Sequence, residues 1–225
     1  MNVSMKAFQL ATIDAEAPVP HARSHIFRSF LNSPTTPGLP LLITSTDVRT
    51  PKIHHILANA NIESCWWIER TSEQFRITGR ISLVTSPDHQ LSKITRDHLL
   101  NNANVDPEGG LAALMPAKFD WEAKRVEIFK SMSAHMKASW CRPAPGSVLE
   151  GGQDEAKKWP ERVEEPKEGD GEEAWKNWER ALGNFALVVI EPSEVDYLTM
   201  AVIPNRRFKT TRAVGGGWDE VEVVP

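Results

Sequence analysis

The sequence predicts a mainly β protein, an antiparallel barrel or sandwich with a few helices on its outside. Short apolar runs recur along the chain between turn-forming residues, which is typical of strands. Only three segments have apolar residues at helical spacing. The 225 residues, 40% of them hydrophobic, are enough to form one large domain.

The first half of the chain is dominated by strands. Strands are predicted at residues 8–13, 21–30, 41–46, 63–68 and 74–85, with a proline-rich loop at residues 32–40. The polar residues 69–72 join the last two strands into a hairpin. One helix is predicted at residues 51–60, because Thr50 is a good N-cap and Pro51 suits the first helical position.

The second half starts with helices and ends with strands. Helices are predicted at residues 88–100 and 119–137, and strands at 185–191, 197–203, 207–214 and 218–224, with three glycines turning the chain at 215–217. Between them, residues 149–180 contain 11 acidic and 6 basic side chains, a net charge of −5. We expect an acidic, flexible insertion there, in which Trp175 and Trp178 share one face of a short helix. The whole chain, 1–225, is otherwise one domain.

Charge and cysteine content exclude several classes of protein. Outside residues 149–180 the chain has 19 acidic and 20 basic side chains, so it lacks the basic surface of a nucleic-acid-binding protein. No run approaches the ~18 apolar residues of a membrane span. Cys65 and Cys141 form neither a disulfide framework nor a zinc motif, which predicts a cytoplasmic protein. His21 and His25 are four residues apart, a metal-ligand spacing only in a helix, so no metal site is predicted.

The segment TSTDVRTPK, residues 44–52, combines a strand end with a helix start. A helix N-terminus offers free N–H groups to an anion. Arg49 and Lys52 add positive charge, and Thr46 and Thr50 add hydroxyl groups, a set that suits a phosphate monoester. The alternative is that Thr50 only caps the helix while the two cations face solvent.

Two further segments carry polar groups on predicted strands. Arg23 and Arg28 are separated by an odd number of residues, so they serve one ligand only if the strand bends or ends between them. Gln74 lies on the same strand face as Arg76 and Thr78. Its amide both donates and accepts hydrogen bonds, which matches the pyrimidine edge of a flavin.

Together these segments resemble the FMN-binding split barrel of the pyridoxamine 5′-phosphate oxidase family, in its cyanobacterial and fungal branch. The branch pattern R-T-V-V-F-R-G-F resembles residues 23–30, and T-D-x-R-S-x-K resembles residues 46–52. C-W-Y resembles residues 65–67, and E-Q-F-R-x-x-G resembles residues 73–79. The resemblance covers nearly the whole chain except residues 149–180.

The resemblance implies FMN as cofactor and a homodimer with two FMN sites between its subunits. It assigns Arg23 and Lys52 to the FMN phosphate, with Thr46, Arg49 and Thr50 beside them. Arg28 stands where many members have a lysine near the flavin ring. Gln74 matches a glutamine at the flavin's polar edge, and Arg207 matches an arginine that reaches the flavin across the dimer interface.

The substrate residues of the family are absent. Its R-x-H-D-R-like motif is replaced by IPNRR at residues 203–207, a tryptophan expected near Leu198 is missing, and Lys137 stands where the branch has a glutamine. Two functions remain. One is an FMN-dependent oxidoreductase that acts on a small molecule through an altered substrate site. The other is a non-catalytic flavin-binding or interaction protein that kept only the cofactor site.

Overall fold

The computed structural model describes residues 6–116 and 118–225. Within these ranges nine strands form one sheet: β1 (Ala7–Ile13), β2 (Pro20–Ile26), β3 (Ser29–Ser33), β4 (Thr36–Asp47), β5 (Asn61–Ile68), β6 (Glu73–Val84), β7 (Phe185–Thr199), β8 (Arg206–Arg212) and β9 (Trp218–Val223). Their order is β2-β1-β5-β6-β7-β4-β3, with β8 and β9 added to the far end of β7, and every pairing is antiparallel.

The sheet closes on itself where β2 meets β4. The backbone N–H of Arg28 donates to the carbonyl of Ile43 at 2.9 Å, and the Thr44 hydroxyl donates to the carbonyl of Ile26 at 2.8 Å. The predicted strand 21–30 is therefore two strands, β2 and β3, with this contact at the break between them. The mainly β, antiparallel barrel expected from the sequence is confirmed.

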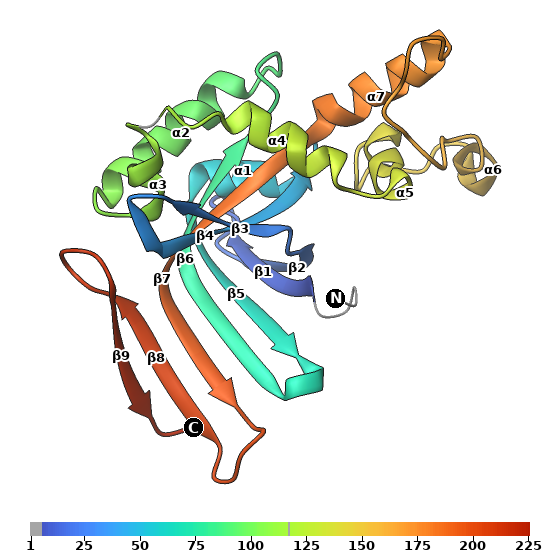
Figure 1. Ribbon diagram of the computed structural model, residues 1–225. Helices are drawn as coiled ribbons and strands as arrows, with labels where there is room; N and C mark the ends of the chain where they lie inside the picture. Colours follow the sequence, from blue (N-terminus) through green and yellow to red (C-terminus); the bar gives the residue numbers. More distant parts are fainter. Residues whose placement is uncertain (1–5, 117) are drawn as a thin grey trace.

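The long strand β7 belongs to two parts of the molecule. Its first half pairs with β4 and β6 inside the barrel, and its second half pairs with β6 and β8 in an arm that extends beyond the barrel (Figure 1). The sequence predicts two strands here, at residues 185–191 and 197–203. In the structure Pro192 lies at a β-bulge opposite Gly79, a position that tolerates proline. A Cβ on Gly79 would lie only 2.2 Å from the carbonyl oxygen of Glu191, so this crossing requires glycine.

Most of the helices cover one face of the sheet. The helices are α1 (Lys52–Ala58), α2 (Ser92–Val105), α3 (Gly110–Leu114), α4 (Trp121–Lys130), α5 (Ala134–Ala138), α6 (Gly152–Ala156) and α7 (Glu172–Asn184), with 3-10 turns η2 (Glu69–Thr71) and η3 (Ser139–Cys141). The predicted helix 119–137 is divided, because Asp120 caps α4 and the hydroxyl of Ser133 accepts a hydrogen bond from the N–H of Met136 at the start of α5. Among the described residues, no helix combines the length and apolar character needed to cross a membrane.

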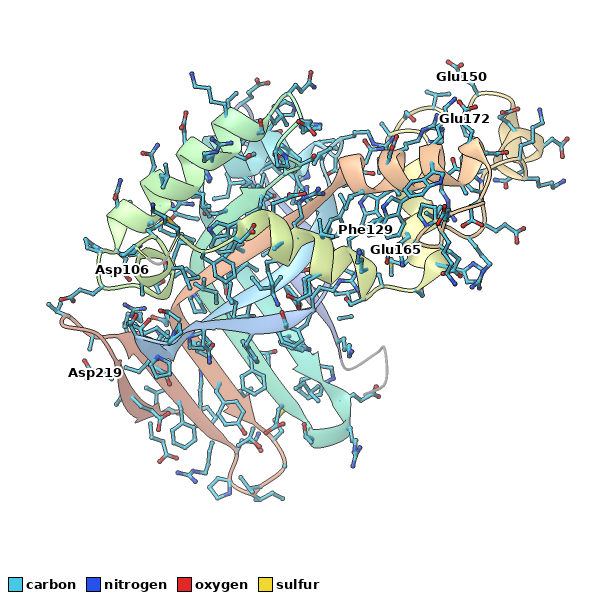
Figure 2. The ribbon with its side chains drawn as sticks, turned by 45° about the horizontal axis from the view of Figure 1, so that its top comes forward. Asp106, Phe129, Glu150, Glu165, Glu172 and Asp219 are labelled. Carbon is cyan, nitrogen blue, oxygen red and sulfur yellow. The ribbon has the colours of Figure 1, made fainter. Side chains whose placement is uncertain are left out.

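Two apolar cores lie on opposite faces of the sheet. Alternate residues of β7 divide between them: Leu187 and Val189 pack against the helices, and Val188 and Ile190 fill the barrel. Phe129 of α4 lies in the helix-side core, between the helices and the sheet (Figure 2).

The acidic segment 149–180 contains more regular structure than the sequence predicts. It holds α6 and the first part of α7, and Trp175 and Trp178 lie on α7 as expected. Trp178 is buried in the helix-side core, where its ring meets that of Phe129 edge-on. Burial of this indole joins α7 to the rest of the fold, while the predicted flexibility of the segment stays a prediction.

Candidate functional site

A cavity of about 1260 Å³ opens between the barrel and the segment that follows α5. Arg28 and Lys52 lie on the barrel side, together with Ser45 and Asp47 at the end of β4. Met136, Trp140, Trp159 and residues 142–151 form the other wall. The cavity therefore joins the segments singled out in the N-terminal sequence to a region more than 80 residues away.

Three of the predicted cationic side chains lie around one buried histidine. Burial lowers the pKa of His25 to about 3, and the positive charges of Lys52, Arg23 and Arg28 act in the same direction. Arg23 and His25 share a face of β2, and Arg28 reaches the same place because β2 ends at Ile26. The strand therefore ends between Arg23 and Arg28, which is the condition under which both arginines can serve one ligand.

The surroundings of Lys52 favour a negatively charged partner. Burial lowers its pKa to about 8, the charge of Arg23 acts in the same direction, and only Asp47 opposes this effect. Cations that are pressed together and partly removed from water favour binding of an anion, which restores the charge balance.

Arg28 and Arg23 are held in place by hydroxyl groups. Nε of Arg28 donates to Oγ of Ser45 at 3.2 Å, and Nη1 of Arg23 donates to Oγ1 of Thr12 at 2.6 Å. Neither arginine has a described carboxylate partner, so both keep charge available for a ligand.

Arg49 has a structural position instead. Its Nε and Nη2 donate to the two carboxylate oxygens of Asp47 at 2.9 and 2.6 Å. Its Nη1 and Nη2 also donate to the carbonyls of Arg142 and Trp140. The side chain therefore fastens η3 to the end of β4, and Arg49 is not among the described residues that line the cavity.

The two threonines stabilise the turn before α1. The hydroxyls of Thr46 and Thr50 both donate to the carbonyl of Asp47, at 3.4 and 2.9 Å. The expected cap at Thr50 is wrong, because α1 begins after Pro51 with no side-chain cap, and the Thr50 hydroxyl is turned back toward β4. This helix has only 7 residues, so its dipole contributes little to anion binding.

Gln74 and Arg207 lie together but away from the cavity. They flank Leu198 on adjacent strands of the arm, so all three side chains share one face. Arg207 forms two hydrogen bonds to the Asp196 carboxylate, at 2.8 and 2.6 Å, and these bonds lower the pKa of Asp196. Within one chain the structure brings Arg23, Arg28 and Lys52 together and places Gln74 and Arg207 in a separate group.

Sequence reasoning missed the second wall of the cavity. Glu150, Glu155 and Trp159 belong to the segment that lies outside the resemblance, yet they line the cavity. Nothing in the local sequence signals this position. The position of this wall depends on long-range contacts to the barrel. Nε1 of Trp140 donates to the carbonyl of Thr46 at 3.3 Å, and Arg49 donates to the carbonyls of Arg142 and Trp140.

Comparison with known proteins agrees with the fold. Residues 1–85 match the family model described as pyridoxamine 5′-phosphate oxidase, FMN-binding domain. The pyridoxine/pyridoxamine 5′-phosphate oxidase 2 of Arabidopsis thaliana is 24% identical over 221 residues, which cover 96% of this chain and 86% of that protein.

Two solved structures are similar over nearly the full length. A pyridoxamine 5′-phosphate oxidase-related, FMN-binding protein from Nostoc punctiforme has a TM-score of 0.68 and 22% identity, with 99% of this chain and 90% of that chain covered. PhzG from Burkholderia lata, solved with tetrahydrophenazine-1-carboxylic acid, has a TM-score of 0.55 and 14% identity, with 99% and 83% covered. At these identities the two structures support the split-barrel fold.

Proposed function

We propose that the cavity binds FMN and that the protein is an FMN-dependent oxidoreductase, because residues 1–85 match the model of the pyridoxamine 5′-phosphate oxidase FMN-binding domain. The observation that carries the proposal is the group of positive charges formed by Arg23, Arg28 and Lys52. None of the three has a described ion pair, and Asp47 acts on Lys52 only through its charge.

The donor set fits the anionic end of FMN. A phosphate monoester carries close to two negative charges at neutral pH and accepts several hydrogen bonds. Lys52 supplies charge at the cavity wall, and Arg28 with Ser45 continues the polar wall. Arg23 is not among the described lining residues, and its charge acts close to Lys52. Bound FMN would supply the transfer of a hydride or an electron pair, while the chain supplies placement and electrostatics.

A homodimer completes the proposed site. Gln74 and Arg207 share one face of the arm but do not line the cavity of their own chain. If each arm reaches the cavity of the other subunit, Gln74 meets the polar edge of the flavin and Arg207 lies beside it. This arrangement accounts for two groups of cofactor residues on separate parts of one chain.

The substrate pocket is proposed to differ from that of pyridoxamine 5′-phosphate oxidases. Residues 142–151 and Trp159 occupy the cavity wall opposite Arg28. The sequence also lacks the substrate-binding motif of the family, which IPNRR replaces at residues 203–207. We therefore expect a small-molecule substrate other than pyridoxamine 5′-phosphate. The second candidate is a flavin-binding protein without catalysis, and the missing substrate residues are compatible with both candidates.

The cofactor assignment is tested by replacing Lys52. We expect Lys52→Met to weaken FMN binding at least about tenfold at pH 7, because the phosphate loses a charge-assisted hydrogen bond. Quenching of FMN fluorescence measures the dissociation constant. Lys93→Met changes an exposed lysine of α2 and is the matched control. Equal affinity in the Lys52 variant and the wild type would remove Lys52 from the site.

Catalysis is tested separately from binding. The FMN-loaded protein is mixed without oxygen with pyridoxamine 5′-phosphate, and in another sample with a nicotinamide donor, while flavin absorbance is followed. Bleaching by either compound supports an oxidoreductase. A flavin that binds tightly and stays oxidised in both samples favours the non-catalytic alternative.

A further inference from the structure

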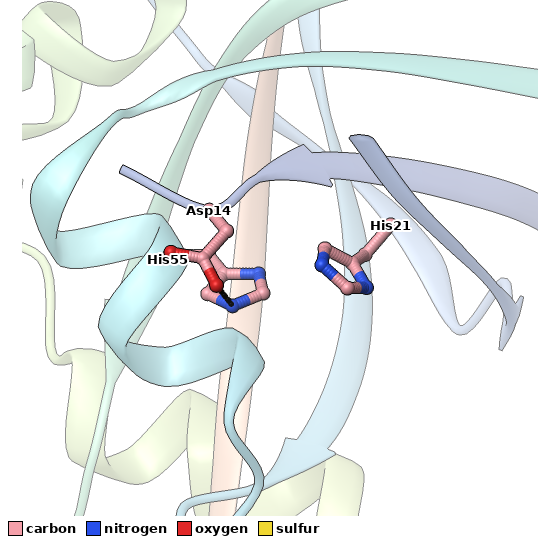
Figure 3. A group of neighbouring side chains, drawn as sticks. All are labelled: Asp14, His21 and His55. Atoms are coloured by element: carbon pink, nitrogen blue, oxygen red, sulfur yellow. Dashed lines mark ion pairs between the residues drawn. The ribbon is translucent and has the colours of Figure 1, made fainter. Parts of the chain in front are cut away.

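A second group of ligand-type side chains lies beside the β1–β2 turn. It contains Asp14 directly after β1, His21 on β2 and His55 on α1 (Figure 3). Each residue offers one ligand atom, and these three atoms lie within 4.8 Å of one another. His25, four residues after His21, does not belong to this group, because it is buried against Thr44 at the other end of the strand.

The Asp14 carboxylate presents one oxygen to this group. Its Oδ1 accepts hydrogen bonds from the backbone N–H groups of Glu16 and Ala17, at 2.9 and 3.5 Å. Its Oδ2 lies 3.5 Å from Nε2 of His55. The turn therefore fixes the direction of the carboxylate and leaves the second oxygen for another partner.

His55 has a hydrogen-bond partner on one ring nitrogen, as metal-bound histidines usually have. Only 7% of the residue is exposed, and Nδ1 lies 3.2 Å from Oγ1 of Thr12, which itself accepts from Arg23. An outer partner on one ring nitrogen fixes the ring and leaves the other nitrogen as a ligand, the usual arrangement around a metal site. Here Nε2 is the nitrogen that faces Asp14.

The distances suit a small transition metal ion. Ligands bound at about 2.0–2.2 Å in a tetrahedral site lie about 3.3–3.6 Å apart. The 3.5 Å between His55 and Asp14 already meets this spacing. His21 is exposed, its ring lies 5.0 Å from that of His55 between centroids, and its ligand nitrogen lies within 4.8 Å of the other two ligand atoms.

We propose that Asp14, His21 and His55 bind one divalent transition metal ion of the zinc type, with a fourth position left for water. Two imidazoles and one carboxylate are a donor set that zinc and similar ions accept in proteins. The ion would join the β1–β2 turn to α1. The elements β2 and α1 also carry Arg23 and Lys52, so a metal ion would fix the mutual position of the two cations.

The proposal is tested by zinc titration of the full-length, chelator-treated protein after removal of any affinity tag. Isothermal titration calorimetry is expected to give one Zn²⁺ per chain, and X-ray absorption at the zinc edge to give two imidazole ligands and one carboxylate. His21→Gln and Asp14→Asn are each expected to weaken binding at least about tenfold. The Asp14→Asn variant keeps a side-chain oxygen for the turn hydrogen bonds, so it should stay folded.

His54 provides the matched control, because it is exposed and adjacent to His55 but outside the group. His54→Gln should bind zinc as the wild type does. The proposal fails if zinc does not bind at one equivalent, or if His21→Gln and Asp14→Asn leave the affinity unchanged. In that case the three residues form only an ion pair with a neighbouring imidazole. FMN affinity is measured on the same samples, so this failure is separable from a failure of the cofactor proposal.

Discussion

The lowered pKa of Lys52 makes the proposed binding of FMN depend on pH. Its pKa, lowered to about 8, means that the free protein loses this charge when pH rises above about 8. Below that pH the ammonium group is present and attracts a phosphate. We therefore expect wild-type affinity for FMN to fall between pH 7 and pH 9, measured by fluorescence quenching at constant ionic strength.

Lys52→Arg separates this effect from other pH effects. A guanidinium group keeps its proton throughout this range, so the variant should lose the decline above pH 8. A decline of equal size in both proteins would show that Lys52 is not the titrating group.

Residue patterns also show which site features can be predicted from sequence. The proximity of Arg23, Arg28 and Lys52 agrees with their grouping from sequence, because each lies within a short strand or next to a turn. Their contact with FMN stays a prediction. The position of Arg49 is not predictable, because its carbonyl acceptors belong to residues 140 and 142. Thr50 has the right chemistry for a cap, but the turn geometry gives its hydroxyl a different acceptor.

At the scale of elements, the link between β4 and η3 determines the shape of the cavity. Asp47 and Arg49 form a bidentate ion pair, and the Asp47 side chain is only 9% exposed. We expect Arg49→Ala to lower the free energy of unfolding by about 3 kcal/mol, because the buried carboxylate and the two carbonyls lose their donor. Urea denaturation measures this change.

Arg142→Ala is the matched comparison for this link. Arg142 contributes its backbone carbonyl, and its exposed side chain is not the donor. Its replacement should change stability by no more than about 0.5 kcal/mol. If Arg49→Ala is equally mild but weakens FMN binding, Arg49 contacts the phosphate, as the resemblance implies, and is not mainly a structural residue.

Elements with strictly local signals are the ones that sequence predicts well. The hairpin of β5 and β6 follows from alternating residues around a polar turn, and its predicted strands differ from the observed ones by one or two residues. The joining of two predicted strands into β7 could not be foreseen, because it depends on Gly79 and the bulge across the sheet. The short helix α3 was missed for a related reason: its glycine-rich start is stabilised by Glu191, which accepts from the N–H of Leu111.

At the scale of the whole molecule, the arm presents two different faces. Gln74 and Arg207 lie on one face, and Phe75, Tyr197 and Phe208 stack on the other with ring centroids 4.9 and 6.1 Å apart. In a twofold dimer each arm contributes the same face to its partner. The proposed FMN site then contains Lys52 of one subunit and Arg207 of the other.

Subunit mixing tests whether Lys52 and Arg207 of one FMN site come from different subunits. Lys52→Met and Arg207→Met are each expected to bind FMN poorly, since each damages both sites of its own dimer. When the two variants are unfolded, mixed in equal amounts and refolded, half of the dimers are mixed, and each mixed dimer has one intact site. We expect about a quarter of the sites to regain wild-type affinity in fluorescence titration. No recovery would place both residues in a site formed by a single chain.

The central place of β7 also affects how the protein is made. This strand begins at residue 185, and both β4 and β6 need it as a hydrogen-bonded neighbour. A ribosome therefore synthesises the residues before 185 while the barrel still lacks β7. During that interval the edges of β4 and β6 stay open to other chains. We therefore expect truncation before residue 185 to leave these edges unpaired and to yield an aggregating fragment without a closed barrel.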